Sequence, residues 1–237
     1  SSAPVSPTPV RNTVFGLILG LLLGLAVGFA RDRLDETVRN RDDLDRSIGG
    51  APVVGIIPGS GPSGGPSARL ESVAQPTSPG AEAYRSLRTS LEVAALDQPV
   101  RSIQLTSAAE REGKAAIAAN LAVSFAATRP TVLIDADLRR PQLHQLFGLR
   151  NAVGLTSVLL GTAELGEALQ AVDDVPNLWI LPTGPVPANP AEALSVPQLR
   201  IAIEDLLAEF DLVVIDSPPV LPTSDALVLS RHADTTL

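Results

Sequence analysis

The chain has 237 residues, enough for one substantial folded domain with a further segment outside it. Its formal net charge of −8 and its pI near 4.8 argue against the clustered Lys and Arg that bind nucleic-acid phosphates, so we expect no nucleic-acid partner. The absence of Cys excludes a disulfide framework and thiol chemistry, and two His leave little room for a His-built metal site.

The first predicted element is a transmembrane helix over residues 13–30, after an extracytoplasmic stub of residues 1–12. This segment (TVFGLILGLLLGLAVGFA) is uncharged, and a helix of its length spans about 27 Å, close to the hydrocarbon thickness of a bilayer. More arginines follow the segment than precede it, so the positive-inside rule places its C-terminal side in the cytoplasm. A signal-peptide core and a buried core helix are the alternative interpretations. Glycines at every fourth position predict a packing face for another membrane helix: Gly16, Gly20, Gly24 and Gly28.

Residues 31–80 are predicted to connect this helix to the next domain. Residues 31–46 carry many charges of both signs with leucine and valine at helical spacing, which predicts a solvated juxtamembrane helix. Residues 51–58 (APVVGIIP) form a short strand-like run, and residues 59–80 have the composition of a flexible tether. We place a domain boundary near residue 80. Because the chain lacks Met and stops within a strand-like run, we expect a fragment whose second domain, residues 81–237, is truncated.

Residues 81–237 alternate between helix-like and strand-like segments. The predicted helices are 81–96, 114–127, 141–149, 156–171 and 191–210, and the predicted strands are 100–106, 131–135, 178–182, 211–216 and 233–237. Continuous apolar strands separated by helices predict an α/β fold with a parallel sheet and helices on both faces. In such folds ligands bind at the C-terminal ends of the strands.

The stretch 102–116 (SIQLTSAAEREGKAA) has the outline of a strand, a phosphate-binding loop and a helix start. A P-loop reads G-x-x-x-x-G-K-[ST], in which backbone N–H groups hold phosphates, the lysine bridges them and the hydroxyl reaches Mg²⁺. Gly113 and Lys114 match, and Lys114 is the only lysine of the chain, whereas positions 108 and 115 are alanines. The predicted nucleotide-binding residues are Ala109, Glu110, Arg111, Glu112, Gly113, Lys114, Ala115 and Ala116.

Two further apolar strands end in aspartates. Residues 131–141 (TVLIDADLRRP) present Asp135 and Asp137, two carboxylates able to hold Mg²⁺ or to accept a proton. Residues 210–219 (FDLVVIDSPP) present Asp216 in the Walker B pattern for Mg²⁺ coordination. Each aspartate taken alone also suits a helix cap after a strand. Together, and in this order after a Gly-Lys loop, they predict a P-loop NTPase-type nucleotide site with Asp135, Asp137 and Asp216 as metal-site residues.

At these residues the sequence resembles the bacterial tyrosine kinases (BY-kinases) of exopolysaccharide synthesis, fused to a chain-length determinant, or polysaccharide co-polymerase. DADLRRP (135–141) is similar to the family's Walker A′ motif, VVIDSPP (213–219) to its Walker B motif, and EAYRSLR (82–88) to its ring-forming E-x-x-R-x-x-R motif. LPTGPVPANPAE (181–192), the glycine-bearing membrane helix and APVVGIIP are also similar to family features. The resemblance implies a missing N-terminal part that holds the first membrane helix and the extracytoplasmic co-polymerase domain.

The resemblance further implies ATP and Mg²⁺ as cofactors and phosphoryl transfer to tyrosines, chiefly of a neighbouring subunit. The protein would lie in the bacterial plasma membrane with a cytoplasmic kinase domain, and it would regulate exopolysaccharide chain length, polymerisation and export with the polymerisation machinery. Lys114 would contact the phosphates, Asp216 would help to hold Mg²⁺, and Asp135 and Asp137 would be catalytic base and metal-site carboxylate in an order that stays open. Glu82, Arg85 and Arg88 would form a homo-oligomeric ring, although their spacing also suits an intrahelical ion pair.

The loop departs from the family's P-G-E-G-K-[ST]-T. Arg111 replaces a glycine whose freedom at positive φ lets the backbone wrap the phosphates, and Ala115 and Ala116 replace hydroxyls, including the one that reaches Mg²⁺. Because electrostatics and positioning supply most of the catalysis in phosphoryl transfer, the loss should impair turnover more than binding. A catalytically impaired pseudokinase scaffold is therefore the main alternative. A ParA- or MinD-like ATPase is disfavoured because its signature lysine would fall at Ala109.

Overall fold

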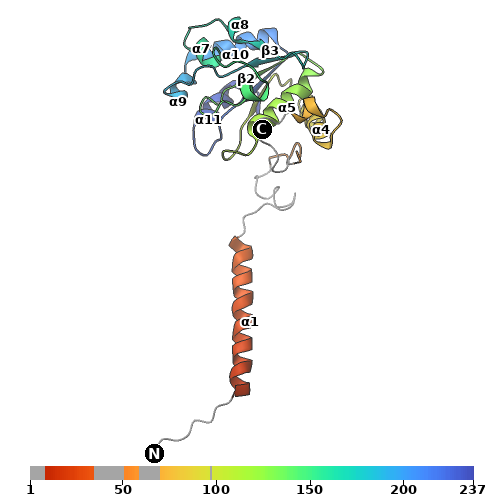
Figure 1. Ribbon diagram of the computed structural model, residues 1–237, viewed down its shortest axis with the longest axis vertical. Helices are drawn as coiled ribbons and strands as arrows, with labels where there is room; N and C mark the ends of the chain where they lie inside the picture. Colours follow the sequence, from red (N-terminus) through yellow and green to blue (C-terminus); the bar gives the residue numbers. More distant parts are fainter. Residues whose placement is uncertain (1–8, 35–50, 59–69, 97) are drawn as a thin grey trace, which may run out of the picture. The chain divides into compact units, whose positions relative to one another are not determined.

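The computed structural model describes residues 9–34, 51–58, 70–96 and 98–237 (Figure 1). The chain divides into two compact units, Ser1–Val53 and Val54–Leu237, and each is described by itself. In the first unit, helix α1 runs over Pro9–Leu34. The remainder of the predicted juxtamembrane helix, residues 35–46, lies outside the described residues.

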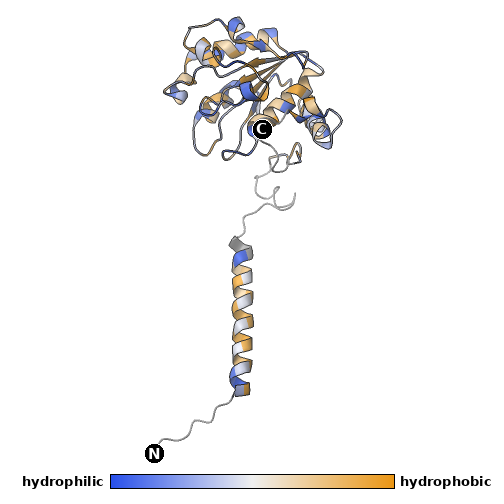
Figure 2. Ribbon diagram, in the orientation of Figure 1, coloured by the Kyte–Doolittle hydropathy of each residue, from blue (hydrophilic) through white to orange (hydrophobic). Residues whose placement is uncertain are grey.

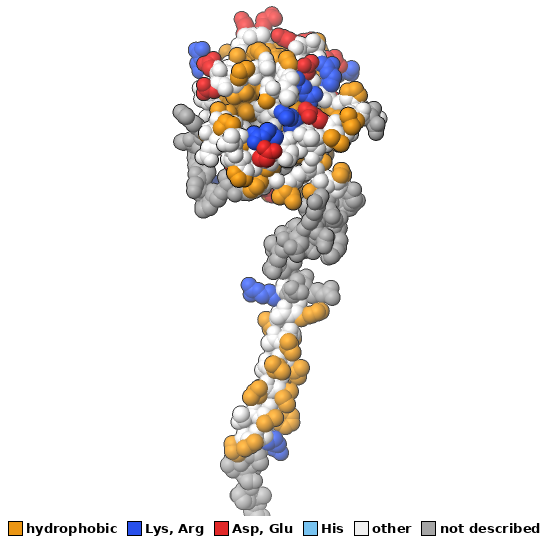
Figure 3. Space-filling model, turned by 90° about the vertical axis from the view of Figure 1, so that its right-hand side faces the viewer, with side chains coloured by type: hydrophobic (Ala, Val, Ile, Leu, Met, Phe, Trp, Pro, Cys, Tyr) orange, Lys and Arg blue, Asp and Glu red, His pale blue; other side chains and the backbone are white. Residues whose placement is uncertain are grey.

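Helix α1 contains the predicted transmembrane segment. Its stretch Pro9–Arg31 has a mean hydropathy of 2.4, and none of the apolar window is buried within the structure. Hydrophobic side chains follow the helix along its length, and basic side chains lie near both ends (Figures 2 and 3). Length and composition therefore fit a membrane span, and these two properties are shared with signal sequences near an N-terminus. All four regularly spaced glycines lie within α1.

The second unit is built on one six-stranded sheet with the strand order β3-β4-β2-β5-β1-β6. The strands are β1 (Ser102–Leu105), β2 (Thr131–Asp135), β3 (Gln170–Ala171), β4 (Leu178–Leu181), β5 (Leu212–Asp216) and β6 (Thr235–Thr236). Every neighbouring pair is parallel except β3 with β4, which is antiparallel. The predicted parallel sheet is thus confirmed with one correction at its edge. The predicted helix 156–171 is wrong as a single helix: it is divided into two short helices, Leu155–Leu159 and Leu165–Ala168, with residues 160–164 between them. Leu169 is extended and ends the second helix, so Gln170 and Ala171 pair as a strand.

Helices cover both faces of the sheet, as predicted (Figure 1). Side chains alternate along β2, because successive residues of a strand point to opposite faces. Leu133 packs into a core shared with α4 (Pro79–Ala94) and α5 (Lys114–Ala126). Val132 and Ile134 pack on the other side, with α7 (Leu155–Leu159) and α10 (Pro197–Glu209) among their neighbours. The central strands are therefore buried on both faces, which explains their continuous apolar sequences.

The remaining helices are short. They are α3 (Glu71–Ala74), α6 (Leu143–Leu146), α8 (Leu165–Ala168), α9 (Pro190–Ala193), α11 (Asp225–Leu229) and the 3₁₀ helix η1 (Ser230–His232). The predicted helix 191–210 is divided between α9 and α10, because Val196 precedes a proline and is held in an extended conformation. Helix α4 begins as its sequence indicates: Ser78 caps it by accepting a hydrogen bond from the Ala81 N–H group at 3.0 Å, and Pro79 follows.

Residues 51–58 do not form the strand that their apolar sequence suggests. Val54 and Ile57 instead pack their side chains, half-buried, against the core that includes Leu87 of α4. Helix α3 also precedes the expected boundary near residue 80 and is tied to α5, since the Asn120 side chain accepts a hydrogen bond from the Ser72 N–H group at 2.9 Å. Segments before residue 80 are thus already part of this compact unit, which begins at Val54.

Candidate functional site

The sheet brings the three predicted site segments together. Strand β5 lies between β1 and β2, so the three strands that lead into the phosphate-loop stretch and the aspartates are adjacent. Asp135 at the end of β2 is in register with Asp216 at the end of β5, and Leu105 at the end of β1 is in register with the same aspartate. The carboxyl ends of these strands therefore meet at one edge, where α/β sheets bind ligands.

Two residues of the loop between β1 and α5 have the positive φ that a tight turn before a helix requires. Arg111 has φ of 65° and Gly113 has φ of 80°, so both lie in the left-handed region. The position where the family places a glycine thus adopts the positive φ that favours glycine, and Arg111 occupies it at a cost of about 1–2 kcal/mol. Helix α5 starts immediately after Gly113 and directs its N-terminus towards the loop.

Lys114 lies between two of the three aspartates. Its ammonium nitrogen is 2.5 Å from Asp216 Oδ1 and 3.6 Å from Asp137 Oδ2. The Lys114 side chain is almost entirely buried, as are the two carboxylates. Burial raises the pKa of Asp216 to about 6, and the neighbouring Lys114 ammonium opposes that rise. The lysine thus supplies the positive charge that these buried carboxylates need.

Asp135 has a different environment. One of its oxygens, Oδ2, accepts hydrogen bonds from the Gln142 and Leu143 N–H groups at 3.1 and 3.0 Å. The other, Oδ1, is buried and has no hydrogen-bond partner among the described residues. Burial, assisted by the charge of Asp216, raises the pKa of Asp135 to about 8, while the hydrogen bond from Leu143 opposes the rise. The Oδ1 atom is therefore available to accept a hydrogen bond from a water molecule or a ligand.

A cavity of about 270 Å³ opens above Lys114. Its lining residues are Ser107, Ala109, Glu110, Arg111, Glu112, Gly113, Lys114, Ala115, Asp137, Arg139, Arg140, Gln142, Pro218, Pro219, Pro222 and Thr223. The cavity therefore includes every predicted nucleotide-binding residue except Ala116. Among the predicted metal-site aspartates Asp137 alone lines it, whereas Asp135 and Asp216 lie beneath its surface.

Carboxylates of the loop engage groups that could otherwise face a ligand. Glu112 accepts a hydrogen bond from the Ala109 N–H group at 3.2 Å, and Glu110 forms an ion pair at 2.7 Å with Arg140, which also lines the cavity. The Ala109 N–H group belongs to the loop that would cradle phosphates, so the Glu112 carboxylate occupies one of its donors. The alanine side chain of Ala115 offers no oxygen to a cation.

The described residues contain no group of three or more His, Cys, Asp or Glu arranged to hold a metal ion. Asp137 and Asp216 nevertheless flank a common cation, the Lys114 ammonium. Two carboxylates around one positive charge fit Mg²⁺, which is commonly bound by one or two carboxylates together with phosphate oxygens. The side chains of the site therefore fit a magnesium ion that a nucleotide brings with it.

The residues of the predicted ring motif make contacts within the chain. Arg85 pairs with Glu82 on the exposed face of α4, as expected for an intrahelical ion pair. Arg88 turns inwards, where it donates a hydrogen bond to the Ser124 carbonyl of α5 at 2.6 Å. Tyr84, the only tyrosine, is 5% exposed and faces the core.

The ion pair between Arg139 and Asp225 at the cavity wall is not predicted by the sequence. Arg139 Nε lies 2.8 Å from Asp225 Oδ2, joining the loop after β2 to the first turn of α11. Asp225 follows Thr223 and Ser224, so in the sequence it looks like an ordinary residue of a helix start. Its 1% exposure, which sequence cannot supply, is what distinguishes it.

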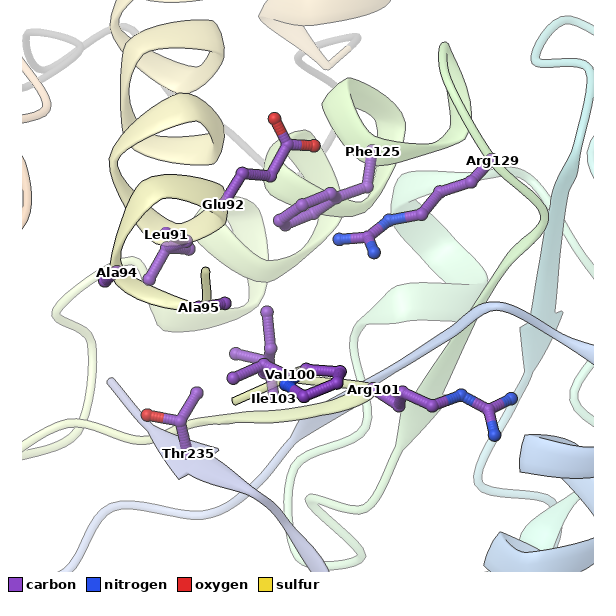
Figure 4. A pocket seen from close by; sticks show the side chains of 11 residues that line it. Leu91, Glu92, Ala94, Ala95, Val100, Arg101, Ile103, Phe125, Arg129 and Thr235 are labelled. Atoms are coloured by element: carbon purple, nitrogen blue, oxygen red, sulfur yellow. The ribbon is translucent and has the colours of Figure 1, made fainter. Parts of the chain in front are cut away.

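A second cavity of about 300 Å³ lies between the C-terminal ends of α4 and α5 and the edge of the sheet at β1 and β6 (Figure 4). Its walls are mostly apolar, and Arg129 lies over the Phe125 ring with 4.7 Å between the guanidinium carbon and the ring centroid. None of the loop residues or the three aspartates lines it. The first cavity is therefore the candidate active site.

Comparisons with known proteins agree on one family. No family model matches the chain. It is 44% identical over 161 residues to the tyrosine-protein kinase YwqD of Bacillus subtilis, covering 68% of each chain. It is 38% identical over 170 residues to the tyrosine-protein kinase wzc of Salmonella typhimurium, covering 71% of this chain and 24% of that longer relative. The chain thus spans about a quarter of the length of wzc.

Solved structures with a similar fold support this assignment. The kinase domain of the Escherichia coli tyrosine kinase ETK superposes with a TM-score of 0.77 and 31% identity, covering 84% of this chain and 80% of that one. The septum site-determining protein MinD from Pyrococcus horikoshii, solved with Mg-ADP, superposes with a TM-score of 0.50 and 27% identity, covering 57% of this chain and 56% of that one. With its P-loop fold and its 44% identity to YwqD, the chain belongs to the bacterial tyrosine kinases, the BY-kinases.

Proposed function

We propose that the chain is a protein-tyrosine kinase that uses ATP and Mg²⁺. The observation that carries this proposal is the Lys114 ammonium, held between Asp216 and Asp137 directly below a cavity formed by the loop and the N-terminus of α5. Such a loop binds phosphates through its backbone N–H groups, and the lysine neutralises their charge. The MinD structure with Mg-ADP and the kinase relatives support the same assignment.

Asp137 and Asp216 are proposed to hold the magnesium ion. Both carboxylates face the cation that Lys114 now provides. A magnesium ion held by these two carboxylates would supply positive charge to offset the charge that develops during phosphoryl transfer. The chain's own part is to hold the two carboxylates in place around one positive charge.

Asp135 is proposed as the proton acceptor. Among the described residues its Oδ1 atom has no hydrogen-bond partner. In the metal-free chain burial raises the pKa of Asp135 to about 8, so this carboxyl accepts a proton only after it has lost its own, and the positive charge of a magnesium ion at the neighbouring carboxylates would favour that loss. Asp135 lies below the cavity surface, so a water molecule is needed to relay the proton. In the proposed reaction a tyrosine oxygen bonds to the terminal phosphorus, the bond from that phosphorus to its bridging oxygen breaks, ADP leaves, and the hydroxyl proton passes to Asp135.

The acceptor is a tyrosine other than Tyr84. Burial raises the pKa of Tyr84, and its side chain is enclosed between α4 and the core. We propose that the acceptor belongs to a neighbouring subunit, in a ring to which Glu82, Arg85 and Arg88 of α4 contribute. The exposed Glu82–Arg85 pair is available to exchange partners, because exposed ion pairs are worth about 0–1 kcal/mol.

We further propose a place for the protein in the cell. Residues 1–12 lie outside the cytoplasm, α1 crosses the bacterial plasma membrane and packs through its glycine face against other membrane helices, and the kinase domain of residues 81–237 is cytoplasmic. The role is to regulate exopolysaccharide chain length, polymerisation and export together with a co-polymerase domain and the polymerisation machinery. The apolar length of α1 and the similarity to kinases such as wzc support this.

A non-catalytic scaffold is the second candidate function. Three observations favour it: Ala115 offers no metal ligand, Arg111 holds a strained conformation, and Glu112 occupies a donor of the loop. A scaffold would bind nucleotide without transferring its phosphate.

Incubation of the chain in detergent micelles with γ-labelled ATP, Mg²⁺ and a tyrosine-rich synthetic peptide separates the two functions. The kinase labels the peptide, Lys114→Ala removes the label, and Ala115→Ser increases it. Absence of label in all three proteins, with nucleotide binding intact, would contradict kinase activity and support the scaffold.

A further inference from the structure

Three arginines line the candidate active site, and they are anchored differently. Arg140 pairs with Glu110, and both side chains of that pair are exposed. Arg111 belongs to the exposed part of the loop. Arg139 pairs with Asp225, which is 1% exposed. A long side chain loses less conformational entropy on binding a ligand when it is already fixed. Among these three arginines, Arg139 is therefore the pre-organised one.

The geometry of the Arg139–Asp225 pair leaves part of the guanidinium available. Arg139 donates from Nε to Asp225 Oδ2 at 2.8 Å and from one terminal nitrogen to Asp225 Oδ1 at 3.3 Å. A guanidinium has five N–H donors in a fixed plane, so roughly three remain for another partner. The Arg139 side chain lines the cavity and is 42% exposed. Its remaining N–H groups can therefore form bidentate hydrogen bonds with phosphate oxygens.

Asp225 is itself held in place by a buried network. The side chain of Gln104 in β1 donates to the Ala226 carbonyl at 2.8 Å and to Ser217 Oγ at 2.9 Å. Ser217 follows Asp216 directly and donates to the Leu105 carbonyl at 2.9 Å. A fully buried glutamine in an apolar strand is retained only if its hydrogen bonds are satisfied, as they are here. This network fixes the first turn of α11 relative to the strand that carries Asp216.

We propose that Arg139 contacts the terminal phosphate of a bound nucleoside triphosphate, and that Asp225 is a positioning residue that aims Arg139 at it. The proposal rests on the nucleotide site described above. Asp137 and Arg139 leave β2 on the same short loop, two residues apart, so a phosphate whose metal ion reaches Asp137 comes within reach of Arg139. The phosphate-loop residues line the same cavity, and a loop of this kind holds the inner phosphates through its backbone.

Nucleotide affinity tests the contact independently of catalysis. The dissociation constants of a non-hydrolysable ATP analogue and of ADP, each with Mg²⁺, are measured by calorimetry on the chain in detergent micelles. Arg139→Gln is expected to weaken the analogue roughly 10- to 100-fold, the value of a hydrogen bond to a charged group, and to leave ADP nearly unchanged. Arg200→Gln is the matched control, because Arg200 also pairs with a carboxylate, Glu204, but on exposed α10 away from the cavity.

A double-mutant cycle tests the positioning role. Asp225→Asn is expected to weaken the analogue about threefold to tenfold in the wild-type background and to add nothing in the Arg139→Gln background, because its effect passes through Arg139. A purely structural role would give the same loss in both backgrounds and for both nucleotides. If Asp225→Asn does not fold, Asp225→Glu keeps the charge but displaces the guanidinium, and it should show the same dependence on Arg139.

Equal weakening of the analogue and ADP by Arg139→Gln, no weakening of either, or additive effects in the cycle would overturn the inference. A chain that labels no tyrosine but shows the selective loss of analogue affinity would contradict the kinase activity alone. A chain that labels tyrosine, with analogue affinity unchanged by Arg139→Gln, would contradict this inference alone.

Discussion

The two sides of the candidate active site differ in how closely they resemble the family motifs and in how deeply they are buried. On one side, the phosphate loop has replaced a glycine and two hydroxyl residues, and its side chains at positions 109–113 are exposed. On the other side, the aspartates match the family pattern and are buried, with exposures of 0% for Asp135, 7% for Asp137 and 1% for Asp216. A loop that acts through its backbone tolerates new side chains, whereas a buried charge needs its partner. We therefore expect function to depend more on the carboxylate side than on the side chains of the loop.

Loss of Lys114 should have the largest effect, because Lys114 serves both sides. Lys114→Ala leaves Asp216 buried without its cation, which should destabilise the fold by about 3–5 kcal/mol and move the Asp216 pKa further up. Tyrosine labelling should fall at least about 100-fold. Denaturation followed by the fluorescence of Trp179, the only tryptophan, measures the first effect. Arg200→Ala, on an exposed surface, is the control, and equal stability of the two variants would contradict this account.

Asp135 should make stability depend on pH. In the folded chain its carboxyl stays protonated up to about pH 8, whereas in the unfolded chain it ionises near pH 3.8. The stability from this group is therefore complete below pH 3.8 and is lost as pH rises through 8. The carboxyl of Asp216 also stays protonated in the folded chain, up to about pH 6, so its contribution to stability is lost as pH rises through 6. Asp135→Asn should flatten the fall in unfolding free energy between pH 6 and 8 in metal-free protein. An unchanged slope in that window would show that Asp135 is not protonated.

Restoring the loop hydroxyl should have a smaller effect on the site than the loss of Lys114 or Asp135. The size of this effect tests the difference between the loop side and the carboxylate side of the site. Ala115→Ser places a hydroxyl in the first turn of α5, where it can reach the metal ion. Mg-ATP affinity should rise about tenfold, or about 1.4 kcal/mol, while affinity measured without Mg²⁺ stays the same. Titration with and without Mg²⁺ measures the difference. An equal gain in both titrations would mean that the serine acts on the loop rather than on the metal.

The smallest effect is expected at Arg111. Because its φ of 65° lies in the left-handed region, Arg111→Gly should relieve strain and stabilise the fold by roughly 1 kcal/mol, partly offset by the greater freedom of glycine in the unfolded chain. Trp179 fluorescence in denaturant measures the change. A matched change to glycine at Arg150, which lies outside the loop and has no positive φ, should destabilise instead. Destabilisation by both changes would show that the loop is not strained.

The sequence predicted the parts of the fold that depend on local patterns. Strands such as 131–135 and helices such as 114–126 were predictable because their apolar runs and the Gly-Lys turn mark them directly. The strand expected at 51–58 was wrong, since whether an apolar run pairs its backbone or only packs its side chains depends on which sheet edge is free. The Arg139–Asp225 pair joins residues 86 positions apart, and no local pattern predicts such a contact.

The central claim is that the buried carboxylates keep the metal site functional although the loop has lost its hydroxyl. The most direct test is the Mg²⁺ dependence of ATP binding, measured by calorimetry for the wild-type chain and for Asp137→Asn, which leaves the Lys114–Asp216 pair in place. We predict that Mg²⁺ tightens ATP binding to the wild-type chain and that this gain disappears in Asp137→Asn. The claim would be contradicted if Mg²⁺ did not change the ATP affinity of the wild-type chain. It would also be contradicted if Mg²⁺ raised the ATP affinity of Asp137→Asn as much as that of the wild-type chain.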